Sequence, residues 1–468
     1  MNSAALGILS IIPPVAAIGL ALWKRQLLFA LFMGVWFGEV VLKRGNIVTA
    51  FVGVIDRSLG AVRAPGNLEI ILFSLLVGGL LKLIKESNGF TGFIHLFDKK
   101  EGRRRETVSF LPFLVGISIF IENYSNILIN GSINTPLFDR FNISRERLGY
   151  FIHTISTNFV ALVVINSWGA FYISLLQTQN ITDPLKVVIK SIPFNFYCLL
   201  SLITVLIVMK TNLTIGPMKK AETKASSGFN LHSANNPMSK GLNSEEFYIP
   251  PRAFNLIFPI TVLLITVILG LYFTGKGDIS RGSGAASVLY GVVTAIIFMA
   301  ILLLVKSRIS FASILNSLFK GIGELFPVGA LLVLALSLGD LCSQMGTGIF
   351  LAGITSQHIP GALIPAILFI VGCLISFATG TSYGTFAILV PIAVPMAQAA
   401  GMPIPLMFAA CISGGVFGDN CSPISDTTII TGLSAGIEVI EHIRTQLPYA
   451  VLTAILAVIA FVAAGFMA

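Results

Sequence analysis

The sequence predicts an all-α protein that crosses a membrane many times, and its composition carries this prediction. Of its 468 residues 55% are hydrophobic and only 11% are charged, and the mean hydropathy is +0.89. A soluble domain covers its surface with about 25% charged residues, so most of this surface must face lipid. The 44 glycines suit such a protein, because glycine lets membrane helices approach closely.

Apolar runs that are long enough to span a bilayer, which takes about 20 residues, recur along the chain. The clear candidates are 4–22, 26–42, 68–84, 107–121, 187–209, 254–273, 285–305, 324–341, 361–378 and 446–467. Apolar stretches that also contain polar residues lie at 122–138, 148–178, 379–398 and 404–435. These four are too polar to face lipid. We therefore expect about 11–13 membrane elements, some of them broken helices or re-entrant hairpins.

Several classes of function lack their sequence signatures. The net charge of +9 comes mainly from basic residues between apolar runs, which indicates topology and not a nucleic-acid surface. The five cysteines form no CxxC pair, so we expect neither a zinc site nor a disulfide framework. P-loop, GxGxxG and HExxH motifs are absent. We therefore expect no enzyme activity and no cofactor.

Two basic loops orient and divide the chain. DKKEGRRRE at 98–106 contains five basic residues, and the loop at 210–252 contains six Lys or Arg against three Glu. The positive-inside rule places both in the cytoplasm. The second loop is rich in Ser, Asn, Gly and Pro, which is typical of a flexible linker. We expect a first membrane half at 1–209, a basic cytoplasmic linker at 210–252 and a second membrane half at 253–468.

The two halves show weak internal similarity. IFIENYSN at 119–126 aligns with SFATGTSY at 376–383 at an offset of 257, and the same offset sets HTISTN at 153–158 against ACISGG at 410–415. In each half one polar break precedes another by about 30 residues. Paired interrupted segments point to the binding site of a transporter. We therefore predict two repeats, related by inversion.

The densest polar stretch is GGVFGDNCSPISDTTI at 414–429. Pro423 interrupts a helix because it lacks a backbone donor, and ionisable residues such as Asp419 and Asp426 are costly inside a membrane. Carboxylates, hydroxyls and carbonyls suit a small hard cation, and a proton competes for a buried carboxylate. The alternative is a helix end, with Asp426 as an ordinary N-cap. The candidate ligands are Asp419, Asn420, Ser422, Pro423, Ser425, Asp426, Thr427 and Thr428, with Na⁺ held at Asp419 and Asp426.

Three other stretches contain candidate site residues. TGTSYGT at 379–385 offers the hydroxyls of Thr379, Thr381, Ser382 and Thr385, unless these bond back to their own helix. In the first half the candidates are Glu122, Asn123, Ser156 and Asn158; the alternative for Glu122 is an interfacial residue at a helix end. His153 is either a pH sensor or a satisfied structural group.

GDNCSPISDTTI, with the upstream TGTSYGT, resembles the signature of the NhaC-type sodium/proton antiporters, which belong to an ion-transporter group with inverted repeats and re-entrant hairpins. The resemblance is strongest from about 361 to 435. Tyr383 stands where many members have Trp. The resemblance implies that the cation-site motif comprises Asp419, Ser422, Pro423, Ser425, Asp426, Thr427 and Thr428, and its companion hairpin Thr379, Gly380, Thr381, Ser382, Gly384 and Thr385. The family also includes exchangers of malate for lactate with sodium.

Together these observations predict a secondary transporter in the cytoplasmic membrane of a bacterium, which exchanges Na⁺ for H⁺ by alternating access. One alternative is exchange of a small organic acid or amino acid coupled to Na⁺ or H⁺, with half-helix N-termini holding the carboxylate. A channel or a membrane-embedded enzyme are further alternatives. The expected partners are the lipid bilayer, Na⁺, H⁺ and, in the first alternative, an organic anion. The sequence leaves open whether the chain forms a homodimer.

Overall fold

The described part of the chain is built from helices. The structure, a computed structural model, describes residues 6–24, 26–64, 67–89, 92, 105–120, 123–164, 166–179, 181–227, 249–277, 282–347, 350, 360–423 and 425–468, and among these no residue forms a strand.

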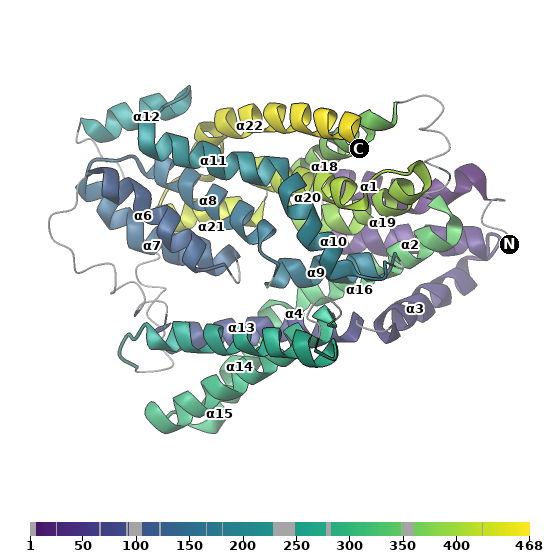
Figure 1. The fold of residues 1–468 in the computed structure, drawn as a ribbon, viewed down its shortest axis with the longest axis horizontal. Helices are drawn as coiled ribbons and strands as arrows, with labels where there is room; N and C mark the ends of the chain where they lie inside the picture. The colour runs from purple at the N-terminus through teal and green to yellow at the C-terminus, as the bar shows by residue number, and fades with distance from the viewer. Residues whose placement is uncertain are drawn as a thin grey trace.

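The helices follow in chain order, with three short 3₁₀ segments between them (Figure 1). The first half contains η2 (Gly7–Ile11), α1 (Ile12–Lys24), α2 (Leu27–Leu42), α3 (Ile47–Arg63), α4 (Asn67–Glu86), α6 (Arg105–Ser118), α7 (Asn123–Arg140), α8 (Arg145–Leu162), α9 (Ser167–Gln177), α10 (Pro184–Ser191), η3 (Ile192–Phe194) and α11 (Phe196–Thr211). The rest contains α12 (Pro217–Ser226), α13 (Phe254–Thr274), α14 (Gly284–Lys306), α15 (Phe311–Glu324), α16 (Phe326–Met345), η6 (Gly361–Leu363), α18 (Ile364–Thr379), α19 (Ser382–Ala400), α20 (Ile404–Cys421), α21 (Asp426–Ala435) and α22 (Val439–Met467).

Seven helices of the described chain are long and apolar enough to cross a membrane, and nine spans result if each of two bent pairs counts as one. The seven are Asn67–Glu86, Phe254–Thr274, Gly284–Lys306, Gly361–Thr379, Ser382–Ala400, Ile404–Cys421 and Val439–Met467. The bent pairs turn by 47° and 41°. The predicted all-α polytopic class is confirmed. The predicted 11–13 elements also include short apolar helices and the helices α6 to α9. These are too short or too polar to be counted among the seven.

The helix order repeats along the chain. Helices α6, α7, α8 and α9 begin at residues 105, 123, 145 and 167, and α18, α19, α20 and α21 begin 259 residues later in each case. Helix α16 is offset from α4 by the same 259 residues at both ends. The internal similarity is therefore present in the helix order. Its register differs by two residues from the predicted 257, because short matches such as Phe120 with Phe377 do not fix a register. The predicted inversion of the repeats remains a prediction.

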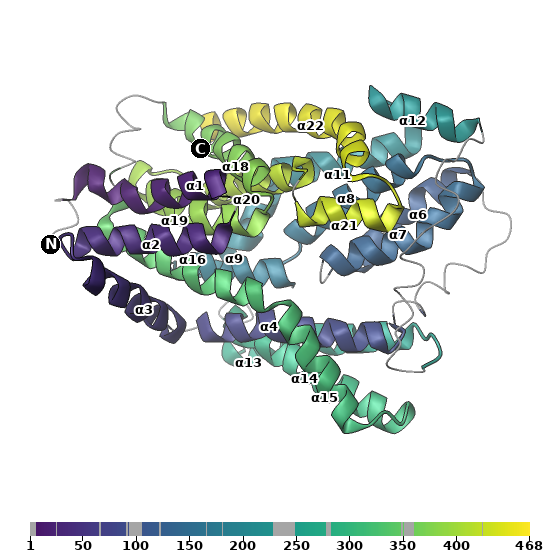
Figure 2. The same ribbon diagram turned by 180° about the vertical axis from the view of Figure 1, so that it is seen from behind.

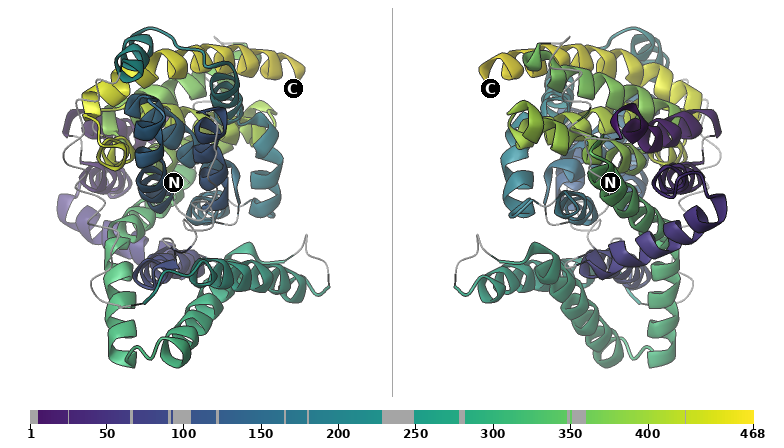
Figure 3. Two further views of the ribbon diagram at one scale, coloured as in Figure 1. Left: turned by 90° about the vertical axis from the view of Figure 1, so that its left-hand side faces the viewer. Right: turned by 90° about the vertical axis from the view of Figure 1, so that its right-hand side faces the viewer.

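Two groups of helices are distinguished by their packing. Helix α14 packs against α13, α15 and α4, and α15 also packs against α4; α13, α14 and α15 project from the rest of the bundle (Figure 3). On the other side α20 packs between α18, α19 and α22, while α21 lies against α7 and α8 (Figure 2). The breaks between α8 and α9 and between α20 and α21 thus belong to corresponding places in the two halves.

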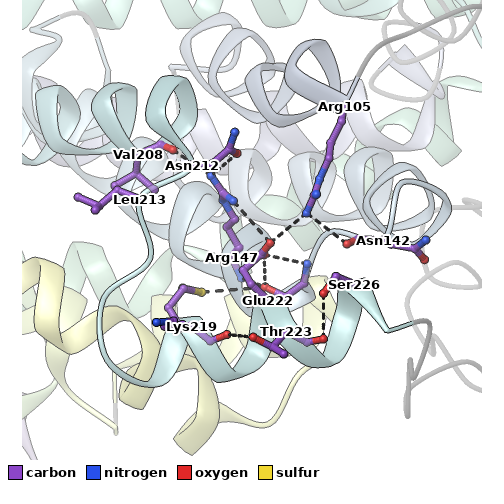
Figure 4. Close-up of polar contacts among 12 residues, drawn as sticks. Arg105, Asn142, Arg147, Val208, Asn212, Leu213, Lys219, Glu222, Thr223 and Ser226 are labelled. Carbon is purple, nitrogen blue, oxygen red and sulfur yellow. Dashed lines mark hydrogen bonds and ion pairs between the residues drawn. The ribbon is translucent and has the colours of Figure 1, made fainter.

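Part of the predicted flexible linker is a helix that docks on the first half. Helix α12 is held by Glu222, whose carboxylate accepts hydrogen bonds from the backbone N–H of Ser144 at 3.0 Å and from its hydroxyl at 2.7 Å. The same carboxylate pairs with Arg105 at 3.2 Å and with Arg147 at 3.5 Å (Figure 4). Arg147 is almost fully buried. Helix α12 therefore fixes the start of α8. The linker residues 228–248 lie outside the described residues.

Replacing Glu222 with Ala is expected to destabilise the protein by about 3 kcal/mol, because it leaves the buried Arg147 without a carboxylate partner. Thermal unfolding in detergent measures the effect. Lys224→Ala on the same helix is the control, since that side chain is exposed. Equal unfolding temperatures for the Glu222→Ala variant and the wild type would contradict the docking role.

Candidate cation site

The break between α20 and α21 is narrower than the sequence suggested. Helix α20 continues to Cys421, so Asp419 lies on its last turn and not on unwound backbone. Ser422 and Ser425 are extended, and α21 begins at Asp426. Pro423 in the break prevents a continuous helix, because a proline there cannot donate to the preceding turn.

Side chains satisfy the backbone carbonyls that the end of α20 leaves open. Thr428 donates its hydroxyl to the carbonyl of Asp419 at 3.3 Å, and Gln446 on α22 donates its amide to the carbonyl of Asn420 at 2.7 Å. A helix end buried without such partners would be strongly destabilised. Hydroxyls and amides that the sequence placed in an apolar chain therefore stabilise the broken helix itself.

The Asp419 carboxylate is buried, with only 2% of the residue exposed. Ser425 donates its hydroxyl to Asp419 Oδ1 at 2.6 Å. Ser382, at the start of α19, and Thr427 also lie within hydrogen-bonding reach of this carboxylate. Since a buried carboxylate is costly without a partner, the cluster of hydroxyl oxygens around it forms a polar site within the protein.

Asp426 is the more open of the two acids. Tyr124 from α7 donates its hydroxyl to Asp426 Oδ2, and the backbone N–H of Thr427 donates to Asp426 Oδ1 at 2.8 Å. Asp426 is exposed at the surface of the protein, next to the break between α20 and α21. The N-cap position belongs to Ser425, and Asp426 is the first residue of α21, where a negative charge is favoured by the helix dipole. The two carboxylates therefore differ in access.

The α18–α19 hairpin packs directly against α20. Gly380 joins the helices with φ of +69°, in the left-handed region that glycine adopts without strain. Ser376 and Ser382 both donate to the carbonyl of Gly415, at 2.5 and 3.3 Å. Thr379 and Thr385 bond back to their own helices, and Thr381 is the extended residue before α19. Of the four predicted hydroxyls only Ser382 reaches the buried carboxylate.

Gly418 allows α18 to approach the site closely. A Cβ at this position would lie 2.4 Å from the backbone nitrogen of Phe377 and 2.4 Å from Ser376 Cβ. We expect Gly418→Ala to separate α18 from α20, to cost about 1–3 kcal/mol of stability and to weaken Na⁺ binding. Unfolding temperature with and without Na⁺ measures both effects. Gly60→Ala is the control, because its Cβ would meet no atom within 4 Å.

The predicted first-half residues have mixed positions. Glu122 lies outside the described residues. Asn123 is buried at the start of α7. Ser156 and Asn158 are buried on α8, and neither bonds to the 414–429 stretch among the described residues: the Ser156 hydroxyl has no hydrogen-bond partner, and Asn158 donates to the carbonyl of Thr154 at 2.8 Å. Thr157 between them does contact the stretch, since it donates to Asn420 Oδ1 at 2.7 Å.

Sequence reasoning missed Tyr124 and Gln446, which contact the break, and His442, which reaches it only through His153. His442 Nε2 lies 2.9 Å from His153 Nδ1, and His153 Nε2 lies 3.0 Å from the Thr427 hydroxyl. His442 and Gln446 stand on the first turns of α22, which the sequence analysis placed before or at the start of an apolar run. No local pattern connects them with residues near 153 or 427, so only the tertiary structure brings them together.

The side-chain atoms around Asp419 and Asp426 that could bind a cation are carboxylate and hydroxyl oxygens. Among the described residues no group of three or more His, Cys, Asp or Glu side chains is arranged to hold a metal ion. Hydroxyl and carboxylate oxygens suit a hard cation, whereas imidazole and thiolate would suit a transition metal. The oxygen atoms of the site therefore suit a small hard cation.

Comparison with known proteins decides the family. The sequence matches the Na⁺/H⁺ antiporter family over residues 160–466, which include α20, α21 and both carboxylates. The chain belongs to this family. It is 31% identical over 481 residues to an uncharacterized protein of Haemophilus influenzae, a match that covers 98% of this chain and 91% of that protein. Membership makes this antiporter-family chain a multi-pass membrane transporter and confirms the resemblance seen in its motifs.

The chain is also similar to a characterised antiporter in sequence and to a solved transporter in structure. Over 175 residues the chain is 30% identical to the malate-2H⁺/Na⁺-lactate antiporter of Bacillus subtilis, and the match covers 36% of each chain. In structure it is similar to the YdaH transporter of Alcanivorax borkumensis, with a TM-score of 0.60, 12% identity and 89% of each chain covered. At this identity the second likeness shows a shared fold only.

Proposed function

We propose that this antiporter-family chain exchanges Na⁺ for H⁺ across the bacterial cytoplasmic membrane by alternating access. The observation that carries the proposal is the buried Asp419 carboxylate, held by Ser425 at the break of a membrane helix. A carboxylate at membrane depth is costly and is retained where it serves an ion pathway. Na⁺ and H⁺ would compete for Asp419 because either one neutralises it.

The two acids have different roles in this proposal. Asp426 lies in the open part of the break and receives the ion first. Asp419 holds the ion within the protein, with hydroxyl oxygens from Ser425 and Ser382 replacing its water. When the site faces outward a proton neutralises Asp419, and when it faces inward the proton leaves and Na⁺ takes its place. The empty charged site is costly to move through the protein, so exchange is coupled.

Reconstituted vesicles test the proposal. A pH-sensitive dye inside liposomes reports the proton gradient, and NaCl is then added outside. Dye recovery that requires Na⁺ is the expected result. No response to Na⁺, Li⁺ or K⁺ would contradict exchange of an alkali cation for protons.

A small organic acid coupled to Na⁺ or H⁺ is the second candidate cargo, favoured by the likeness to the malate-2H⁺/Na⁺-lactate antiporter. The start of α21 offers backbone N–H groups at a helix N-terminus, which attract a carboxylate. In the same vesicles, dye recovery that appears only after malate or lactate is added would favour this cargo over a simple cation exchange.

A further inference from the structure

The two buried histidines form a hydrogen-bonded chain with the Asp419 site. From α22 inward it runs through His442 Nε2 and His153 Nδ1, 2.9 Å apart, and then from His153 Nε2 to Thr427 Oγ1 at 3.0 Å. Thr427 Oγ1 lies 2.8 Å from Ser425 Oγ, which donates to Asp419 Oδ1 at 2.6 Å. Both imidazoles are 0% exposed, so bulk water does not replace any link.

The amide of Gln446 determines which nitrogens carry the protons. Gln446 Nε2 donates to the carbonyl of Asn420 at 2.7 Å, which identifies this atom as the donor nitrogen. The same nitrogen lies 3.3 Å from His153 Nδ1, which favours a neutral His153 with its proton on Nε2 and with the one Nδ1 lone pair shared between this amide and His442 Nε2. His442 then donates from Nε2, and every bond in the chain donates toward Asp419.

The hydrogen-bonded chain ends, on the side away from Asp419, at His442 Nδ1. This nitrogen is buried and has no hydrogen-bond partner among the described residues. It lies next to Gly149 on α8, where a Cβ would be only 3.0 Å from Nδ1, so glycine leaves room for the imidazole at this position. Gly149 lies four residues before His153 on α8 and is therefore closer to the start of this helix. Glu222 of the linker binds that start through Ser144. This end lies on the face that the positive-inside rule assigns to the cytoplasm.

We infer that His442 and His153 carry protons between Asp419 and the cytoplasmic face; the inference rests on the proposed exchange. A proton that binds His442 Nδ1 releases the Nε2 proton to His153 Nδ1, and His153 releases its own Nε2 proton to Thr427. The hydroxyls of Thr427 and Ser425 each pass one proton on, and Asp419 ends as the neutral acid. The reverse sequence starts from the Nδ1-protonated tautomers that the first sequence leaves behind. When Na⁺ displaces the Asp419 proton, Ser425 and Thr427 pass a proton to His153 Nε2, His153 Nδ1 passes its proton to His442 Nε2, and His442 Nδ1 releases one to the cytoplasm.

Other titratable groups stand on the elements that pack against the pair, but none hydrogen-bonds either imidazole among the described residues. They include Asp419 on α20, Asp426 on α21, Tyr124 on α7, Arg145, Glu146, Arg147 and Tyr150 on α8, Tyr197 on α11, Glu222 on α12, and Glu438, Glu441, Arg444 and Tyr449 at and on α22. Among the described residues, His153 and His442 are therefore the only titratable groups in the hydrogen-bonded chain between Thr427 and Gly149.

His442→Gln tests the inference, because glutamine can still donate to His153 but cannot relay a proton. In liposomes we expect Na⁺-driven proton flux to fall at least about 10-fold, while exchange of ²²Na⁺ for Na⁺, which needs no proton, stays within twofold of wild type. Loss of both exchange modes would show a structural role and overturn the inference, as would an unchanged proton flux. Thr453→Val, a buried hydroxyl on the same helix, is the control.

A second readout does not depend on which cation is transported. In ¹⁵N-histidine spectra of the purified protein, with His153→Gln and His442→Gln used for assignment, we expect a neutral His153 protonated on Nε2. A His153 protonated on Nδ1 would overturn the direction of the chain. If the wild type shows no Na⁺-driven proton flux while this tautomer is found, the proposed exchange fails and the hydrogen-bonded chain stands.

Discussion

Asp419→Asn is expected to abolish Na⁺-driven proton movement in liposomes. The amide keeps the size of the carboxylate and its contact with Ser425, but it neither binds a proton at neutral pH nor offers a charge to Na⁺. A charged hydrogen-bonded contact is worth about 3 kcal/mol, which corresponds to a loss of about 100-fold or more in binding. Initial rates of dye recovery after a Na⁺ jump measure the loss.

The control for Asp419→Asn is Asp183→Asn. Asp183 caps α10 by accepting from the backbone N–H of Lys186 at 3.1 Å, and asparagine caps helices as well as aspartate does. We expect wild-type rates for Asp183→Asn. Transport by a correctly folded Asp419→Asn protein at more than a tenth of the wild-type rate would remove Asp419 from the mechanism.

Asp426→Asn is expected to raise the Na⁺ concentration for half-maximal exchange by about 10-fold, which equals about 1.4 kcal/mol. The charge at the open side of the break is lost, and so is the favourable interaction with the start of α21. Tyr124→Phe removes only the hydroxyl that donates to this carboxylate, so it should produce a smaller change in the same assay.

The comparison of these two variants separates an ion-binding role of Asp426 from a helix-end role. A helix-end role predicts a lower unfolding temperature for Asp426→Asn and an unchanged Na⁺ dependence. Ion binding predicts a higher Na⁺ concentration for half-maximal exchange, whatever the change in unfolding temperature. If Tyr124→Phe impaired exchange more than Asp426→Asn does, the tyrosine and not the carboxylate would be the functional group.

Much of the fold was predictable because it follows from hydropathy and helix-breaking residues. Apolar runs identified α13, α14, α18 and α22, and Pro423 identified the break after α20. Helix ends were less predictable. The linker composition gave no sign of α12, because that helix is stabilised by the pairing of Glu222 with two arginines from the first half.

The sequence predicted the centre of the site better than its surroundings. Asp419, Ser425 and Ser382 do lie together, and Asn420 lies beside them. The hydroxyls of Thr379 and Thr385 donate to carbonyls of their own helices. The sequence could not show this, because a ligand role and a helix-internal hydrogen bond require the same residue types. Tyr124 comes from α7, and His442 and Gln446 come from neighbouring turns of α22, so their role depends on tertiary contacts alone.

Proton release on Na⁺ binding tests the central claim most directly. Purified protein in weakly buffered detergent solution, with a pH indicator present, receives NaCl or an equal amount of choline chloride. We predict that Na⁺ releases protons from the wild type and from Asp183→Asn, and that it releases none from the Asp419→Asn/Asp426→Asn double variant. Na⁺ binding by the wild type without proton release, or undiminished release from the double variant, would contradict competition of Na⁺ and H⁺ at these carboxylates.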